Sequence, residues 1–266
     1  MKIYKGNIKN LVAVLLLVMV FSSCVPRKEM LYLKDPVMVS ETISKDYVNE
    51  RSINYKLQPG DNLYIRALNS VDERSVATLN GESLSRSGNY LSNDASIYLN
   101  SYTLDEEGCI ELPLTGKVEL KNLTVEEAKG KLQTELNKYV NETMLIVKMS
   151  NFNLTILGEV NKPGMYKVYQ SQINLFEALS MAGNGTTFAK NNAVKIIRQT
   201  PKGSEIITVD LGQADILESP YYYLKPNDII YVEPLPMKQW GFSTFPYSTV
   251  ISIVTLGITL FTLLKK

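Results

Sequence analysis

The sequence contains no histidine. This absence excludes catalysis by Ser-His-Asp and Cys-His groups and removes the commonest zinc ligand. Cysteine is almost as scarce, because the chain has only Cys24 and Cys109, whose settings are better explained separately than as a disulfide. Cys109 lies in a strand-like stretch, where a free cysteine behaves as a small hydrophobe. We therefore expect no catalytic residue, no metal and no cofactor.

An excess of charge of one sign is also missing. The chain has 28 Lys and Arg against 27 Asp and Glu, a formal net charge of +1. Without the first 23 residues, which hold three lysines and no acid, the balance is 25 minus 27, or −2. Nothing in this balance indicates a nucleic-acid partner. Because 45% of the 266 residues are hydrophobic and 21% are charged, the chain can form one or two domains with packed cores.

The N-terminus has the pattern of a secretory signal. Three lysines precede the unbroken apolar run 11–21, and two serines come directly before Cys24. These features predict a signal peptide over 1–23, since the run is too short for a transmembrane helix; an uncleaved signal anchor is the alternative. Small residues before a cysteine also resemble a bacterial lipobox, in which Cys24 would be acylated, although Phe21 stands where that pattern usually has Leu. The polar segment 24–50 would then be a tether.

One motif occurs twice in the chain. Residues 55–65 and 222–232 share tyrosine, leucine, proline, aspartate and two alternating aliphatic residues at identical spacing. Proline fixes φ, Gly or Asn accepts a positive φ, and Asp bonds its own backbone, so each copy predicts a tight turn that leads into a half-buried strand. We interpret the acids as structural, a catalytic role being the alternative. The predicted turn residues are Pro59, Gly60 and Asp61 in the first copy and Pro226, Asn227 and Asp228 in the second.

The first copy begins an expected module over 51–150. Alternation around an acidic turn predicts a hairpin over 102–112. Thr124 and Glu127 form a capping box, which predicts a helix, and a short strand over 144–149 follows it. The stretch 69–100 is a long loop, either functional or disordered. The apolar face of the helix is expected to contain Val125, Ala128, Leu132, Leu136 and Tyr139.

A second module is expected over 151–236. It begins with an alternating strand, followed by a type II turn at Pro163 and Gly164. Asn174 caps a short helix, and a hairpin forms around 201–203. The second copy of the repeated motif ends this module.

Parts of both modules resemble known domains. Tyr55-Lys-Leu-Gln-Pro-Gly-Asp61, the hairpin residues 105–113 and the helix start 123–128 resemble the polysaccharide export domain. Residues 157–164 and the helix end 178–183 resemble an SLBB (soluble ligand-binding β-grasp) domain. In this order they are similar to the outer-membrane polysaccharide export family, the Wza-like proteins.

The resemblance implies an α+β fold with two small β-rich modules, the second β-grasp-like, between an N-terminal lipoprotein signal and a C-terminal apolar helix. It implies a protein that is not an enzyme: a subunit of a homo-oligomeric ring, lipid-anchored in the outer membrane with most of the chain in the periplasm. Such a ring exports capsular or exopolysaccharide. Its implied partners are the polysaccharide, membrane lipid and an inner-membrane co-polymerase, often a tyrosine autokinase.

The C-terminus combines a linker over 237–247, rich in interfacial aromatics, with an apolar membrane helix over 248–266. Hydroxyl residues at steps of four and three lie on one side of this helix. The resemblance favours a barrel of such helices with the hydroxyls facing a lumen. The alternative is a single-pass anchor whose hydroxyls bond their own backbone or a neighbouring helix. The hydroxyl stripe consists of Ser248, Ser252, Thr255, Thr259 and Thr262.

Two other classes of function stay open. An acylated glycan-binding periplasmic adaptor of the export machinery would have the same domains without forming a pore. A glycan hydrolase would need two carboxylates, and the densest acids are Asp105, Glu106 and Glu107, on the expected hairpin turn. Tyr221, Tyr222 and Tyr223 are a candidate glycan or partner surface, although aromatic residues near strands are more often packed.

Overall fold

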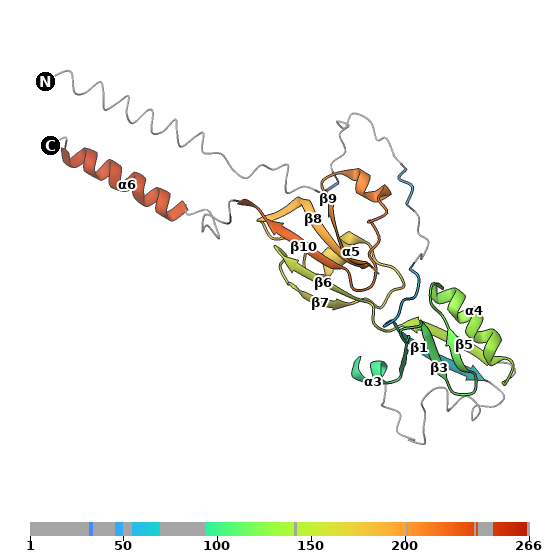
Figure 1. Ribbon diagram of the computed structural model, residues 1–266. Coiled ribbons are helices and arrows are strands. Elements are labelled where there is room, and N and C mark those ends of the chain that lie inside the picture. Colours follow the sequence, from blue (N-terminus) through green and yellow to red (C-terminus); the bar gives the residue numbers. More distant parts are fainter. Residues whose placement is uncertain are drawn as a thin grey trace.

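The computed structural model describes residues 32–33, 46–49, 55–69, 94–140, 143–200, 202–236, 238 and 247–264. The expected signal peptide, Cys24, most of the tether, most of the 69–100 loop and nearly all of the aromatic linker lie outside these ranges. The fold is mixed α+β with several small sheets (Figure 1). Residues 55–150 form an N-terminal module and residues 151–236 form a C-terminal module, each with its own hydrophobic core.

The N-terminal module is built around β1 (Asn62–Asn69), which pairs antiparallel with β2 (Ser101–Thr103) and with β5 (Thr143–Met149). The short helix α3 (Asp94–Leu99) precedes β2. Helix α4 (Val125–Leu136) begins at the expected capping box and packs against β5. Three of its expected core residues are buried, but Tyr139 lies beyond the helix end and is 60% exposed.

The expected hairpin over 102–112 was wrong. Strand β2 pairs with β1, whereas β3 (Cys109–Leu112) forms a two-stranded sheet with β4 (Gly116–Glu119). The acidic turn between β2 and β3 is closed by hydrogen bonds among its own residues. The Asp105 carboxylate accepts the Glu107 and Cys109 N–H groups at 3.0 and 2.8 Å. The chain therefore changes sheet at this turn instead of reversing within one sheet.

The C-terminal module contains a five-stranded sheet in the order β7-β6-β10-β8-β9. Its central strand β10 runs parallel to β6 and antiparallel to β8. The sequence-based hairpin around 201–203 and the helix cap at Asn174 are confirmed. The elements are β6 (Asn153–Gly158), β7 (Gly164–Lys167), α5 (Leu175–Met181), β8 (Ala189–Thr200), β9 (Gly203–Val209), η2 (Ala214–Glu218) and β10 (Ile229–Pro234).

The type II turn expected at Pro163 and Gly164 does not form. Gly164 is the first residue of β7, pairs with Ile156 and has no positive φ. The left-handed backbone lies instead at Gly158, the last residue of β6, with φ of 89°. A Cβ at Gly158 would lie 2.1 Å from the carbonyl oxygen of Val232, so glycine is required for the close approach of β6 to β10.

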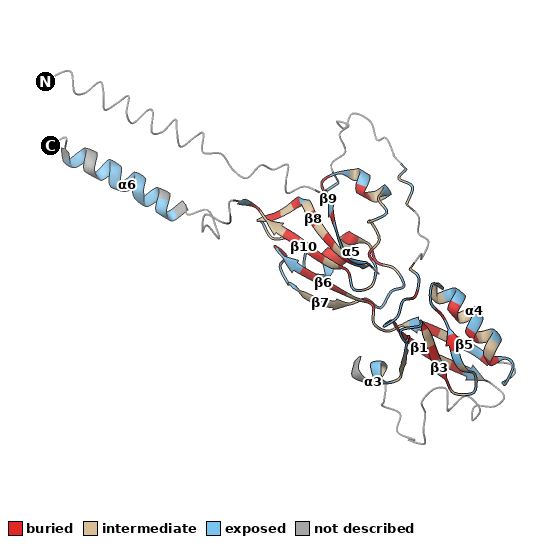
Figure 2. Cartoon of the chain, in the orientation of Figure 1, coloured by how far each residue is buried: buried red, intermediate tan, exposed pale blue. Residues whose placement is uncertain are grey.

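The last helix, α6 (Tyr247–Leu264), has 18 residues. Its described side chains are all exposed, including five large aliphatic residues in its first twelve positions: Ile251, Ile253, Val254, Leu256 and Ile258 (Figure 2). Within the ranges that the structure describes, no helix is long and apolar enough to cross a membrane. This finding does not support the expected membrane helix over 248–266.

Candidate functional site

The two copies of the repeated motif form the same turn. Gly60 and Asn227 occupy equivalent positions with φ of 89° and 66°. In the first copy, the Asp61 carboxylate accepts the Gln58 N–H at 2.8 Å. In the second copy, Asp228 accepts the Lys225 N–H at the same distance of 2.8 Å. Each aspartate therefore holds its own turn closed, and strands β1 and β10 begin directly afterwards.

The two aspartates differ in their second partner. The Tyr55 hydroxyl donates to both oxygens of Asp61, at 2.9 and 3.1 Å. At Asp228 that place is taken by Arg198, which donates from Nε and Nη2 at 2.9 and 2.7 Å. Burial raises the pKa of Asp61, and the Gln58 and Tyr55 hydrogen bonds oppose this rise. Burial and the Asp61 charge also raise the pKa of Tyr55, which keeps its hydroxyl protonated as a donor.

Both turns are bonded to residues 150–153, which connect β5 to β6 and are called the linker below. The Asn151 side chain accepts the Asn62 N–H at 3.0 Å and donates to the Gly60 carbonyl at 3.3 Å. Two residues later, the Asn153 carbonyl accepts the Asn227 N–H at 2.8 Å. Met149, just before the linker, packs against both hydrophobic cores. The repeated motif therefore fastens each module to the same short piece of chain.

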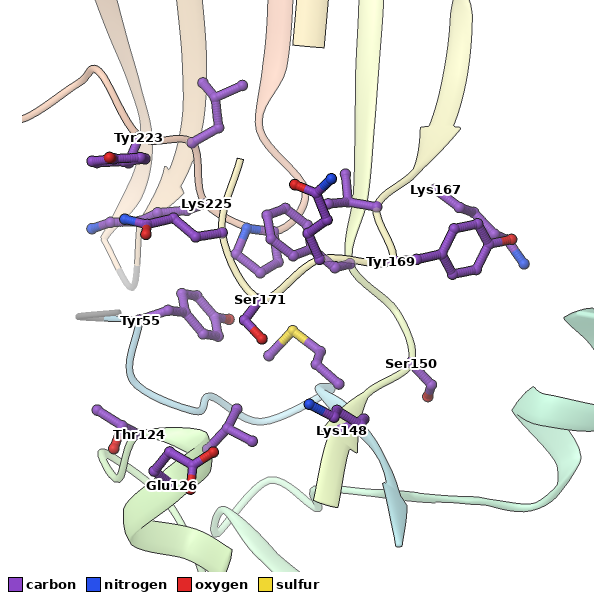
Figure 3. Close-up of a pocket in the computed structure, with 18 of the residues that line it drawn as sticks. Tyr55, Thr124, Glu126, Lys148, Ser150, Lys167, Tyr169, Ser171, Tyr223 and Lys225 are labelled. Carbon is purple, nitrogen blue, oxygen red and sulfur yellow. The ribbon is translucent and has the colours of Figure 1, made fainter. Parts of the chain in front are cut away.

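A cleft of about 1210 Å³ lies at this junction, with walls from both modules (Figure 3). The N-terminal module contributes Tyr55, Tyr64, Thr124, Glu126 and Lys148, among others. The facing wall is formed mainly by the segment 167–172, between β7 and α5, and by residues from 218 to 226. The labelled side chains of Figure 3 show this arrangement: Tyr223, Lys225, Lys167 and Tyr169 lie on one side, and Tyr55, Thr124, Glu126 and Lys148 lie on the other.

The chain that precedes the N-terminal module contacts the folded modules at two places. The Leu33 N–H donates to the Leu211 carbonyl at 2.9 Å, and the Tyr32 ring meets Phe176 edge-on with 6.0 Å between centroids. Further along, Val48 and Asn49 line the cleft. The segment expected to be a tether is therefore in contact with the folded modules at residues 32–33 and 48–49.

Comparison with protein families divides the chain at the same linker. Residues 49–150 match the polysaccharide biosynthesis/export protein family, and residues 153–232 match the SLBB domain. The chain belongs to the Wza-like polysaccharide export family. Members of this family are cell-envelope components that work with polysaccharide-export machinery, and the family is one of transport rather than catalysis.

In this family member, the acids considered for a hydrolase lie on the turn between β2 and β3. The Lys117 side chain reaches this turn from β4, with Nζ at 3.0 Å from the Asp105 carboxylate and 2.5 Å from that of Glu107. Hydrogen bonding from the Cys109 N–H, and then from Lys117, lowers the pKa of Asp105. A hydrolase acid needs a raised pKa, so this arrangement favours a structural role for the turn. Asp105, Glu107 and Cys109 are also close enough to share an ion.

The hydroxyl stripe of the export protein lies on α6, and four of its five hydroxyls donate within the helix. Ser252 donates to the Ser248 carbonyl at 2.7 Å, and Thr259 donates to the Thr255 carbonyl at 2.7 Å. Thr255 and Thr262 donate to carbonyls three or four residues earlier. This geometry matches the intrahelical bonding of the single-anchor alternative, and it leaves oxygen lone pairs on the exposed face.

Of the candidate tyrosines, all three are half-buried. Tyr222 packs between Phe176 and Tyr223, at 6.3 and 4.9 Å between ring centroids, and Tyr223 also lines the cleft. Tyr221 lies 5.8 Å from the Arg198 guanidinium. Only Tyr223 of this group is therefore placed to contact a molecule in the cleft.

Sequence reasoning missed Arg198 and Asn151. Arg198 continues the inward series of Val194 and Ile196 along β8, and a charged residue at an inward strand position indicates a buried partner. This alternation along β8 could have identified Arg198 from the sequence. Asn151 had no comparable signal, because a single polar residue between two strands is typical of any loop.

Proposed function

We propose that this protein is a subunit of an oligomeric channel that exports capsular or exopolysaccharide, anchored in the outer membrane by acylation of Cys24. The observation that carries the proposal is the pair of matched domains, in export-then-SLBB order, joined at one bonded linker. Most of the chain would lie in the periplasm and act without catalysis. The partners would be further copies of the chain, an inner-membrane co-polymerase and the polysaccharide itself. The parallel β6–β10 pair beside α5 supports a β-grasp-like assignment for the second module.

The docking of Tyr32 supports a defined position for the anchor. Seven residues separate Cys24 from Tyr32, and eight steps of extended chain reach about 28 Å. Tyr32 and Leu33 contact the C-terminal module at Phe176 and Leu211. An acylated Cys24 would therefore hold the SLBB module close to the membrane surface, with the export module farther away along the chain.

The exposed face of α6 supports assembly. An isolated helix with this many exposed aliphatic residues requires a covering surface, because large exposed apolar patches mark interaction sites. At about 100° per residue, the five hydroxyl residues fall within an arc of about 80°, leaving the aliphatic residues on the remaining surface. We propose that α6 helices of neighbouring subunits pack together with the stripe facing a shared lumen. Hydroxyls suit a sugar conduit because they exchange hydrogen bonds without trapping charge.

The proposal is tested by deleting the gene in its source cell and restoring it with variants. Deletion is expected to abolish surface polysaccharide, measured by staining intact cells, and the native gene restores it. An alkyne fatty acid fed to the cells should label the native protein and Cys109→Ala but not Cys24→Ala. Unchanged surface polysaccharide in the deletion strain would contradict the export function, and labelling of Cys24→Ala would contradict the anchor.

The adaptor is the second candidate, because the α6 hydroxyls already donate within their own helix and so do not require a lumen as partner. The two candidates differ in assembly state. A channel subunit extracted in mild detergent should sediment as a closed oligomer at micromolar concentration. The adaptor would be supported if the extracted protein sediments as a monomer and deletion of its gene still abolishes export.

A further inference from the structure

The cleft between the modules is larger than most small-molecule sites. Its volume of about 1210 Å³ exceeds the range of roughly 300–1,000 Å³ that is typical of such pockets. It is bounded on both sides by different modules, so a ligand in it would contact the two halves of the protein at once. This size favours a segment of a polymer over a single small molecule.

Tyrosines lie on both walls of the cleft. Tyr55 and Tyr64 belong to the N-terminal module, and Tyr169 and Tyr223 belong to the C-terminal module. Tyr169 is 81% exposed, so its ring contributes little to the core. A tyrosine offers a flat apolar ring face and a hydroxyl together, which suits a ligand with apolar C–H faces and polar edges. Sugar rings have that character.

The cleft also has an excess of positive charge. Its walls contain the lysines Lys148, Lys167 and Lys225 against the carboxylates Glu126 and Glu218. Within the described part of the chain, Lys148 and Lys225 form no ion pair. Both are exposed, one on each wall. Two lysines facing one space from opposite sides favour a ligand with carboxylates.

Neutral polar groups complete the lining. The segment between β7 and α5 contributes Gln170, Ser171 and Gln172, and the linker contributes Ser150. These amides and hydroxyls both donate and accept, as sugar hydroxyls require. Exposed lysines bind carboxylates weakly, which is compatible with a polymer that must move on.

We propose that the cleft between the two modules binds a segment of an acidic polysaccharide, with carboxylates against Lys148 and Lys225 and sugar rings against Tyr169 and Tyr223. This inference rests on the proposed export function and names its polymer class. Each module then forms one wall of a single binding site, and the hydrogen-bonded linker sets the distance between the two walls.

The test uses the full chain purified in detergent, with a galacturonate oligomer as probe and a neutral glucose oligomer of equal length as comparison. Affinity is measured by calorimetry at low and high salt. The double variant Lys148→Gln/Lys225→Gln is expected to weaken galacturonate binding about tenfold, because two charge-assisted contacts are lost. The matched control Lys121→Gln/Lys202→Gln changes two exposed lysines outside the cleft, one in each module, and should leave binding unchanged.

A second pair of variants tests the aromatic contact. Tyr169→Ala is expected to weaken binding several-fold, while Tyr139→Ala, an exposed tyrosine outside the cleft, should not. Absence of galacturonate binding, equal binding of the neutral oligomer, or equal loss in the control variants would each overturn the inference. So would cysteine cross-linking that places a second copy of the chain in the cleft.

The outcomes separate this inference from the proposed function. Loss of export on gene deletion together with no binding in the cleft would leave the export function standing and remove the site. Binding in the cleft with normal export in the deletion strain would keep the site and remove the export function.

Discussion

Arg198 and Asp228 form a two-point ion pair in the interior of the C-terminal module, with N–O distances of 2.9 and 2.7 Å. The side chains are 8% and 1% exposed. The pair joins the C-terminal end of β8 to the turn before β10, so it connects the second copy of the repeated motif to the sheet. Its counterpart in the first copy is the neutral donor Tyr55.

Removing one member of the pair should be costly. We predict that Arg198→Met lowers the free energy of unfolding by about 3–5 kcal/mol, because Asp228 is left charged and buried without its partner. Lys195→Met on the same strand breaks a more exposed pair with Glu233, which water screens, and should therefore cost much less than Arg198→Met. Urea unfolding measures both. The double variant Arg198→Met/Asp228→Asn should recover part of the loss, and equal costs for the two single variants would contradict the prediction.

Tyr55→Phe should destabilise the N-terminal module in a pH-dependent way. The folded pKa of Asp61 lies above its ordinary value of 3.8, so its burial destabilises the fold increasingly as pH rises through that folded pKa. The Tyr55 hydroxyl offsets part of this cost by bonding the carboxylate. We therefore expect the variant to lose about 1–3 kcal/mol near pH 7 and less near pH 3, where Asp61 is protonated in both states.

The measurement for Tyr55→Phe is the urea midpoint at the two pH values. Tyr64→Phe is a suitable control, since Tyr64 also lines the cleft but does not bond Asp61. A loss that is equal at both pH values would show that packing, and not the carboxylate, accounts for the effect.

The hydrogen bonds of Asn151 are expected to hold the two modules in one relative orientation, so their loss should let the modules move about the linker. Asn151→Ala removes the hydrogen bonds to Asn62 and to Gly60, while the two hydrophobic cores stay intact. We expect about 1–2 kcal/mol of destabilisation and a broader distribution of distances between the modules. Spin labels at positions 111 and 202, both exposed and in different modules, report that distribution in a background without the native cysteines. Asn192→Ala, an exposed asparagine in β8, should leave it narrow.

The local features of the fold could be predicted from the sequence, because each depends on residues that are close together in the chain. The capping boxes at Thr124 and Asn174 need only a side chain three residues away, and both form as expected. The turn between β2 and β3 was misread because strand pairing is a choice between distant partners: β2 pairs with β1, about forty residues earlier. The turn expected at Gly164 does not form because Gly164 is already the first residue of β7 and pairs with Ile156.

The candidate site was less predictable than the domains. Family resemblance identified the two modules, and the repeated motif was visible as a pair of turns. That Asn151 and Asn153 bring both turns to one linker depends on how the modules meet, which no local pattern encodes. The cleft lysines Lys148 and Lys225 are exposed residues in the sequence pattern, and only the fold places them on facing walls.

The hydroxyl stripe of α6 gives a prediction that distinguishes helices lining a shared lumen from a helix that serves only as an anchor. In a Cys109→Ala background, a thiol introduced as Thr255→Cys would face the shared interior, and one introduced as Ile258→Cys would face outward. A water-soluble charged methanethiosulfonate should then label position 255 in the assembled protein and leave position 258 largely unlabelled, because charged reagents do not enter an apolar surrounding. Under the proposed acylation, Cys24 would have no free thiol and would not interfere.

Protein unfolded in urea is the control for this labelling. Both positions then lie in water, so both should react equally. Labelling of 258 but not 255 in the assembled protein would place the hydroxyls against another helix, where their bonds to the helix backbone already satisfy them. The stripe would then serve packing, and the sugar path would have to lie elsewhere in the assembly.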